Sequence, residues 1–187
     1  MALAAQGSMM SRAAPVMRAG CLSASVFCVS DLMAQHVQNR HKLDKSNDWK
    51  RTARFSLVGL TLHGPFFLWG FGMLDKTMGP GKTLTVALKK TALGQVTLFP
   101  TYLTAFFMYM SALEGTGFEG GRKKIQDNFV AMYTSGSVFW PVANVTNFMF
   151  VAPAARMLYV NACSLLWNAF LSWYNNTTRH QQLICQD

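Results

Sequence analysis

The sequence predicts an all-α protein, an integral membrane helical bundle of about four transmembrane helices with room for an interfacial amphipathic helix. Of its 187 residues, 51% are hydrophobic and only 13% are charged, whereas roughly 25% are charged in soluble domains. Apolar segments of about 20 residues, long enough to cross a bilayer, recur along the chain. Polar residues recur within these segments at helical spacing. The length leaves no room for a separate soluble catalytic domain.

The chain begins with a basic stretch. No acidic residue precedes Asp31, whereas Arg12, Arg18 and several Ser and Ala are present. This composition is typical of a mitochondrial presequence, and a short basic tail ahead of the first span explains it equally well. The expected division is a basic N-terminal tail over residues 1–14, a membrane domain over residues 15–175 and a polar C-terminal tail over residues 176–187.

The first two helices are expected over Pro15–Gln38 and Phe55–Leu74. The first carries a polar side that includes Asp31 and Gln35, which the bundle must keep away from lipid. The second is nearly uncharged and contains Gly64-Pro65. Because proline removes a backbone donor and clashes with the preceding turn, we expect a kink there.

A turn and a short basic helix ending at Lys90 precede the third span, Thr91–Leu113. Pro100 predicts a second kink in this span. A Gly-rich charged loop is expected over Glu114–Lys124. The threonines of the third span share one face: Thr97, Thr101 and Thr104.

The fourth and fifth segments, Phe129–Val151 and Arg156–Tyr174, are separated by residues 152–155, which include Pro153. They are either two spans, or one span and an interfacial helix. Each carries a polar stripe at helical spacing. The stripe residues are Trp140, Asn144 and Asn147 on the fourth segment and Asn161, Ser164, Asn168, Ser172 and Asn175 on the fifth.

Polar faces on several spanning helices can meet inside a bundle in two ways. They hydrogen-bond across helices and hold them together, or they line a hydrated path. The charged residues Asp31 and Arg156 favour the second explanation, because a charge at mid-bilayer costs several kcal/mol unless it is paired or hydrated. If Arg156 lies at a membrane boundary beside Pro153, it needs no such explanation, since its side chain can reach the headgroups.

The sequence offers no catalytic, metal or cofactor site. Gly79–Thr83 ends like a phosphate-binding loop, but Lys76 stands where the first glycine is required. The four histidines show no metal-ligand spacing, and the four cysteines form no CxxC pair. We therefore expect neither an enzyme nor a bound cofactor or metal. The net charge of +9 lies mostly in short connections, which favours anionic lipid headgroups over nucleic acid as the partner.

Two blocks of spaced residues carry a resemblance to a known family. The late block is Trp140-Pro141, Asn147-Phe148, Val151, Pro153, Arg156, Asn161, Trp167-Asn168 and Leu171-Ser172; the earlier positions are Asp31, Gln35, Asp48–Arg51, Gly64-Pro65, Trp69, Leu74-Asp75, Lys89-Lys90, Gln95 and Pro100. This pattern resembles the small integral membrane proteins that include the peroxisomal membrane protein of 22 kDa and the Mpv-seventeen proteins of the mitochondrial inner membrane. The chain departs from the family at Leu68, Gly70, Gly94, Ser137, Asn144 and Ala152, which thins the polar and aromatic set.

The resemblance implies a four-span organelle membrane protein that forms a channel or pore for ions or small metabolites and influences membrane potential and reactive-oxygen balance. A non-conducting membrane scaffold or assembly partner is the competing hypothesis. The expected location is the mitochondrial inner membrane, with the peroxisomal membrane as the alternative. Expected partners are the lipid bilayer and small solutes or ions; a homo-oligomer is left open, and no nucleic acid is expected. The candidate pore-lining or intramembrane polar residues are Asp31, Gln35, Gln95, Asn144, Asn147, Arg156, Asn161 and Asn168.

Overall fold

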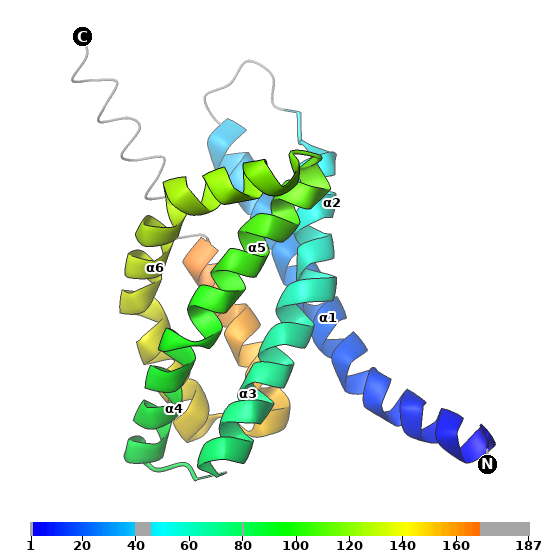
Figure 1. The fold of residues 1–187 in the computed structure, drawn as a ribbon, viewed down its shortest axis with the longest axis vertical. Helices are drawn as coiled ribbons and strands as arrows, with labels where there is room; N and C mark the ends of the chain where they lie inside the picture. The colour runs from blue at the N-terminus through cyan, green and yellow to red at the C-terminus, as the bar shows by residue number, and fades with distance from the viewer. Residues whose placement is uncertain (1, 40–45, 80, 169–187) are drawn as a thin grey trace.

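The computed structural model describes residues 2–39, 46–79 and 81–168, and every regular element among them is helical (Figure 1). The all-α prediction is therefore confirmed. The predicted C-terminal tail, Ser172, Asn175 and the end of the fifth segment lie outside the described residues. The elements are α1 (Ala2–Asn39), α2 (Trp49–Val58), the π-helical turn η1 (Gly59–His63), α3 (Gly64–Met78), α4 (Leu84–Val96), α5 (Leu98–Glu114), α6 (Gly117–Phe150), the 3₁₀ turn η2 (Pro153–Ala155) and a helix over residues 156–168.

Three helical stretches in the described chain are long and apolar enough to span a membrane: Ala13–Asn39, Trp49–Met78 and Leu84–Glu114. The 34-residue α6 is the fourth long helix. The predicted count of about four transmembrane helices therefore holds approximately. Large apolar side chains also cover the outside of the bundle, as expected where lipid replaces water. They include Trp69, Val96, Val130, Val138, Val142, Phe150, Leu158 and Leu166. The protein is an integral membrane helical bundle.

α1 begins at Ala2, well before the predicted start, and Pro15 lies inside the helix. Its N-terminal part projects away from the bundle (Figure 1). The alanines of this stretch favour a helix, and Pro15 does not end it. The helix also crosses the predicted boundary at residue 14. A targeting role for the first residues stays a prediction.

Glycines bring α1 into backbone contact with the next spanning helix. A Cβ atom on Gly59 would lie 2.7 Å from the Ser23 carbonyl oxygen, and one on Gly64 would lie 2.6 Å from the Ala19 carbonyl oxygen. Small residues at helix crossings allow such close approach within a membrane. These contacts hold the polar side of α1 against the other helices.

Both predicted proline irregularities are present, in different forms. Before Gly64-Pro65 the helix widens into η1, where the Gly64 N–H donates to the Gly59 carbonyl oxygen. The third span breaks at Thr97. Pro100 explains this break, because it cannot donate to the Val96 carbonyl four residues earlier and its ring crowds that group. The predicted basic helix and the start of the predicted third span form α4, and the rest of that span is α5.

The prediction of a loop over Glu114–Lys124 was wrong beyond residue 116. α5 ends at Glu114 and is capped by Gly115, which has a φ of +77°, and α6 begins at Gly117. Gly121 is a packing residue, since a Cβ atom there would lie 2.5 Å from the Met108 sulfur on α5. The first turns of α6 run across one end of the bundle, and the helix then turns along α4 and α5 (Figure 1).

The chain reverses after α6 at residues 151–155, as predicted, and helix 156–168 returns into the bundle (Figure 1). Met157 and Val160 of this helix join a buried apolar cluster with Ala19, Leu74 and Phe148. This cluster thus joins α1, α3, α6 and helix 156–168.

Candidate functional site

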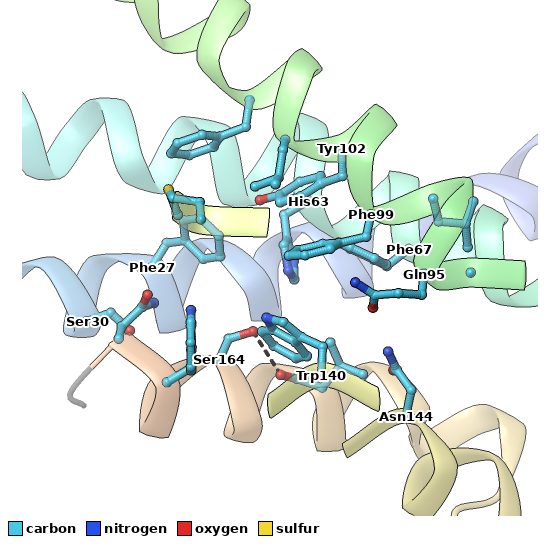
Figure 2. Close-up of a pocket in the computed structure, with 18 of the residues that line it drawn as sticks. Phe27, Ser30, His63, Phe67, Gln95, Phe99, Tyr102, Trp140, Asn144 and Ser164 are labelled. Carbon is cyan, nitrogen blue, oxygen red and sulfur yellow. Dashed lines mark hydrogen bonds between the residues drawn. The ribbon is translucent and has the colours of Figure 1, made fainter. Parts of the chain in front are cut away.

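A cavity of about 400 Å³ lies at the centre of the bundle, and every spanning helix contributes to its wall. Figure 2 shows Phe27 and Ser30 of α1, Tyr102 of α5 and Trp140 of α6 around the same space. The wall is mostly aromatic and aliphatic, with polar side chains at intervals. Such a composition is usual for sites that hold small molecules.

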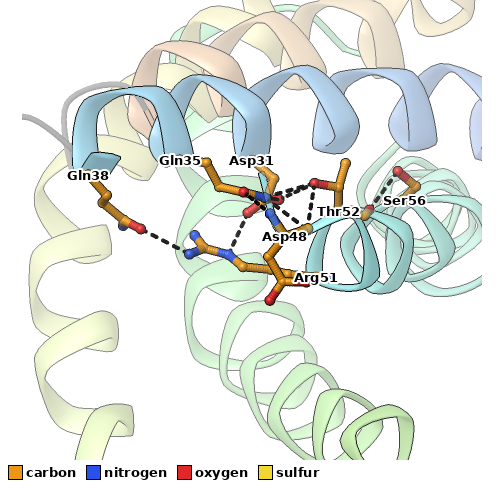
Figure 3. A network of polar contacts seen from close by, with 7 residues as sticks. All are labelled: Asp31, Gln35, Gln38, Asp48, Arg51, Thr52 and Ser56. Atoms are coloured by element: carbon orange, nitrogen blue, oxygen red, sulfur yellow. Dashed lines mark hydrogen bonds and ion pairs between the residues drawn. The ribbon is translucent and has the colours of Figure 1, made fainter. Parts of the chain in front are cut away.

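At one end of the cavity lies a polar network that we call the Asp31 cluster: Asp31, Gln35, Asp48, Arg51 and Thr52 (Figure 3). The Asp31 Oδ2 atom accepts hydrogen bonds from Gln35 Nε2 and Thr52 Oγ1, both at 2.7 Å. Arg51 Nε lies 2.7 Å from Asp31 Oδ1. Gln35 Oε1 accepts from the Asp48 backbone N–H at 2.6 Å. The cluster therefore ties the end of α1 to the start of α2 and neutralises Asp31.

At the other end lies a second group, the Lys90 cluster, formed by Asp75, Lys90, Arg156 and Phe148. Lys90 Nζ lies 2.6 Å from Asp75 Oδ1, and Arg156 Nη1 lies 2.5 Å from Asp75 Oδ2. The Phe148 ring lies beneath both cations, with its centroid 5.5 Å from Lys90 Nζ and 5.0 Å from the Arg156 guanidinium carbon. α3, α4, α6 and helix 156–168 meet at this cluster.

Between the two clusters the wall carries His63 and Gln95. The His63 ring packs between Phe27 and Phe67, with centroid distances of 4.9 Å to each, and its Nδ1 atom lies 3.2 Å from Ser23 Oγ. Gln95 Nε2 donates to Ser137 Oγ at 2.7 Å and so joins α4 to α6. Both side chains are labelled in Figure 2.

Some polar groups on the wall have no hydrogen-bond partner. Ser30 Oγ and Thr91 Oγ1 are buried, line the cavity and have no partner within the described chain. A buried polar atom is usually paired with protein or with ordered water. A cavity of this size with unpaired hydroxyls on its wall is suited to hold water or a polar solute.

The eight candidate residues fall into two sets. Asp31, Gln95, Asn144 and Asn168 border the cavity. The other four are buried between helices and are not among the described cavity-lining residues: Gln35, Asn147, Arg156 and Asn161. Asn147 is fully buried, and neither side-chain atom has a partner in the described chain.

Two sequence expectations do not match this geometry. The threonine face of the third span points outward, and Thr97, Thr101 and Thr104 each donate to the carbonyl four residues earlier. Arg156 does not extend out of the bundle, because its side chain is only 4% exposed and pairs with Asp75. A sequence distance of 81 residues separates these two partners.

Asp75, Lys90, Thr91, Ser30 and His63 were missed as site residues. Two signals were available for the ion pair: Asp75 is the only acidic residue between Asp48 and Glu114, and both Asp75 and Lys90 belong to the family-like blocks. An isolated acid in an apolar segment requires a cation. The described residues contain no group of three His, Cys, Asp or Glu side chains that could hold a metal ion.

The sequence is similar to one family of known proteins. The sequence model of the Mpv17 / PMP22 family matches residues 111–172. The PXMP2/4 family protein 4 of Dictyostelium discoideum is 31% identical over 87% of this chain and 88% of that protein. Protein sym1 of Aspergillus oryzae is 32% identical over 87% and 91% of the two chains. The mitochondrial inner membrane protein Mpv17 of Danio rerio is 31% identical over 81% and 85%. No solved structure matches the chain.

Proposed function

The chain belongs to the Mpv17 / PMP22 family, and from this premise we propose that its central cavity forms a channel or pore for ions or small metabolites. Such an activity would influence membrane potential and reactive-oxygen balance. The observation that carries the proposal is the cavity of about 400 Å³, which is lined by all the spanning helices and bears hydroxyls without a partner in the described chain. Polar groups along a water-filled path through a membrane are the common means of solute passage.

Two asparagines offer the sharpest test of this proposal. Asn144 of α6 and Asn168 of helix 156–168 both border the cavity. In a planar bilayer with the purified full chain, we expect the double variant Asn144→Leu/Asn168→Leu to conduct several-fold less than the wild-type protein. The matched control is Thr101→Val/Thr104→Val, which removes two exposed hydroxyls outside the cavity. The proposal fails if the wild-type protein passes no current, or if both double variants conduct as it does.

A non-conducting scaffold is the second candidate, and the Asp31 cluster favours it. In that cluster the polar side chains join α1 to α2, so few of their hydrogen-bonding groups are left to bind a solute. This function predicts that the asparagine double variant lowers bundle stability while the membrane stays tight with and without it. Under either function we expect no enzymatic activity and no nucleic-acid partner, and assembly into a homo-oligomer stays open.

The mitochondrial inner membrane is the location that we favour, with the peroxisomal membrane as the alternative. The relatives from Danio rerio and Xenopus laevis are named mitochondrial inner membrane proteins. The N-terminal residues of this chain add support, because they contain arginine and no acid before Asp31. Imaging a C-terminal fluorescent fusion against mitochondrial and peroxisomal markers tests the location, and a signal that coincides with the peroxisomal marker alone would favour the alternative.

A further inference from the structure

Lys90 is a fully buried cation on the wall of the central cavity. We propose that Lys90 and Thr91 form a binding site for an oxyanion, the carboxylate or phosphate group of a small solute. The inference rests on the proposed function, because it names the class of solute that the cavity takes.

The Lys90 cluster contains more positive than negative charge. One carboxylate, Asp75, lies between two cations, and the side chains of Lys90 and Arg156 are 0% and 4% exposed. Buried charges are normally paired, since removing an ion from water without a partner is costly. The Phe148 ring stabilises cations only weakly. One positive charge in this cluster therefore lacks a counter-ion within the described residues.

Hydrogen-bond donors at the cluster are also incompletely used. An ammonium group has three N–H donors, and Lys90 Nζ makes one hydrogen bond, to Asp75, within the part of the chain that the structure describes. The hydroxyl of Thr91, the next residue of α4, is buried, lines the cavity and has no partner there. Lys90 and Thr91, adjacent on the cavity wall, thus retain unused hydrogen-bond donors among the described residues. The amide of Asn144 lies on the same wall, one helical turn before Phe148.

Among the residues that the structure describes, no second carboxylate pairs with Lys90 or Arg156. Asp75 is the only acidic residue between Asp48 and Glu114, and none follows Asp127 until Asp187, which lies outside the described residues. The exposed lysines nearby along α3, α4 and their connection add positive charge around the cluster: Lys76, Lys82 and Lys89. This concentration of positive charge attracts anions to this end.

The test is thermal unfolding of the purified full chain in detergent, followed by the fluorescence of its five tryptophans. Inorganic phosphate and acetate are the probes, each titrated at constant ionic strength set with sodium chloride. A ligand that binds only the folded state raises the midpoint saturably, and we expect a rise of about 2–4 °C for a chain of this size. A response to acetate alone identifies a carboxylate site, and a response to phosphate alone identifies a phosphate site.

Three variants assign the effect to this site. Lys90→Met should abolish the response, and Thr91→Val should weaken the apparent affinity about tenfold while keeping the midpoint without probe. Lys89→Met removes an exposed lysine beside the site and should respond like the wild-type protein. If Lys90→Met does not fold, Thr91→Val decides alone.

The inference is overturned if neither probe shifts the wild-type midpoint, or if Thr91→Val and Lys89→Met respond equally. These measurements need no conduction. If the protein responds to the probes but passes no current, the binding site stands and the proposed pore fails. If it conducts but does not respond to the probes, the pore stands and the binding site fails.

Discussion

The two ends of the cavity carry ion pairs with opposite patterns of burial. In the Asp31 cluster the carboxylate is buried, at 2% exposure, and its cation Arg51 is 33% exposed. In the Lys90 cluster both cations are buried and the carboxylate of Asp75 is 22% exposed. Asp31 receives hydrogen bonds from two neutral side chains in addition to its cation, whereas the Lys90 cluster relies on a single carboxylate. The first end is suited to hold helices together, and the second retains capacity to bind a ligand.

The largest effect is expected from Asp75→Asn, which removes the only carboxylate between two buried cations. Breaking a buried ion pair by deleting one partner costs about 3–5 kcal/mol, so this variant should accumulate poorly in membranes or unfold far below the wild-type temperature. The measurement is the unfolding midpoint in detergent. The double variant Asp75→Asn/Lys90→Met should recover part of the loss, because only Arg156 is then unpaired. A double variant no more stable than Asp75→Asn would argue against charge as the cause.

A smaller effect is expected from Asp31→Asn at the opposite end. Asparagine retains an oxygen for Gln35 and Thr52, and the partly exposed Arg51 can turn toward water. We expect a loss of about 1–2 kcal/mol, between the values for exposed and buried pairs. The measurement is the same unfolding midpoint, compared directly with that of Asp75→Asn. Equal losses in the two variants would remove the distinction between the ends.

The smallest effect is expected from Thr52→Val within the Asp31 cluster. Its hydroxyl donates to Asp31 and accepts from Gln35 at 2.9 Å, and losing a neutral donor of this kind costs about 1 kcal/mol. Ser56→Ala is the matched control, since the Ser56 hydroxyl donates to the Thr52 carbonyl one turn earlier and to no other group in the described chain. If both variants had the same unfolding midpoint as the wild-type protein, the Asp31 cluster would not be needed to join α1 to α2.

Local sequence patterns predicted the helices and the proline irregularities, and they singled out Asp31, Asn144 and Asn168, which border the cavity, as does Gln95, which the family resemblance indicated. They failed where long-range packing decided the outcome. Gly121 is typical of a loop but allows α6 to contact α5. The spacing of Thr97, Thr101 and Thr104 indicates a shared face without indicating that it points outward. The Lys90 cluster was beyond a periodicity argument, because Asp75, Lys90 and Arg156 meet only when three helices pack.

The difference in charge between the two ends of the cavity is tested most directly by a reversal potential. It is measured for the reconstituted protein in a bilayer with a tenfold gradient of potassium acetate. If Lys90 provides the cavity with its excess positive charge, Lys90→Met should move the reversal potential toward the potassium equilibrium potential. Lys89→Met, which removes an exposed lysine next to it, should leave the potential at the wild-type value. Identical reversal potentials for the wild-type protein and Lys90→Met would contradict the account.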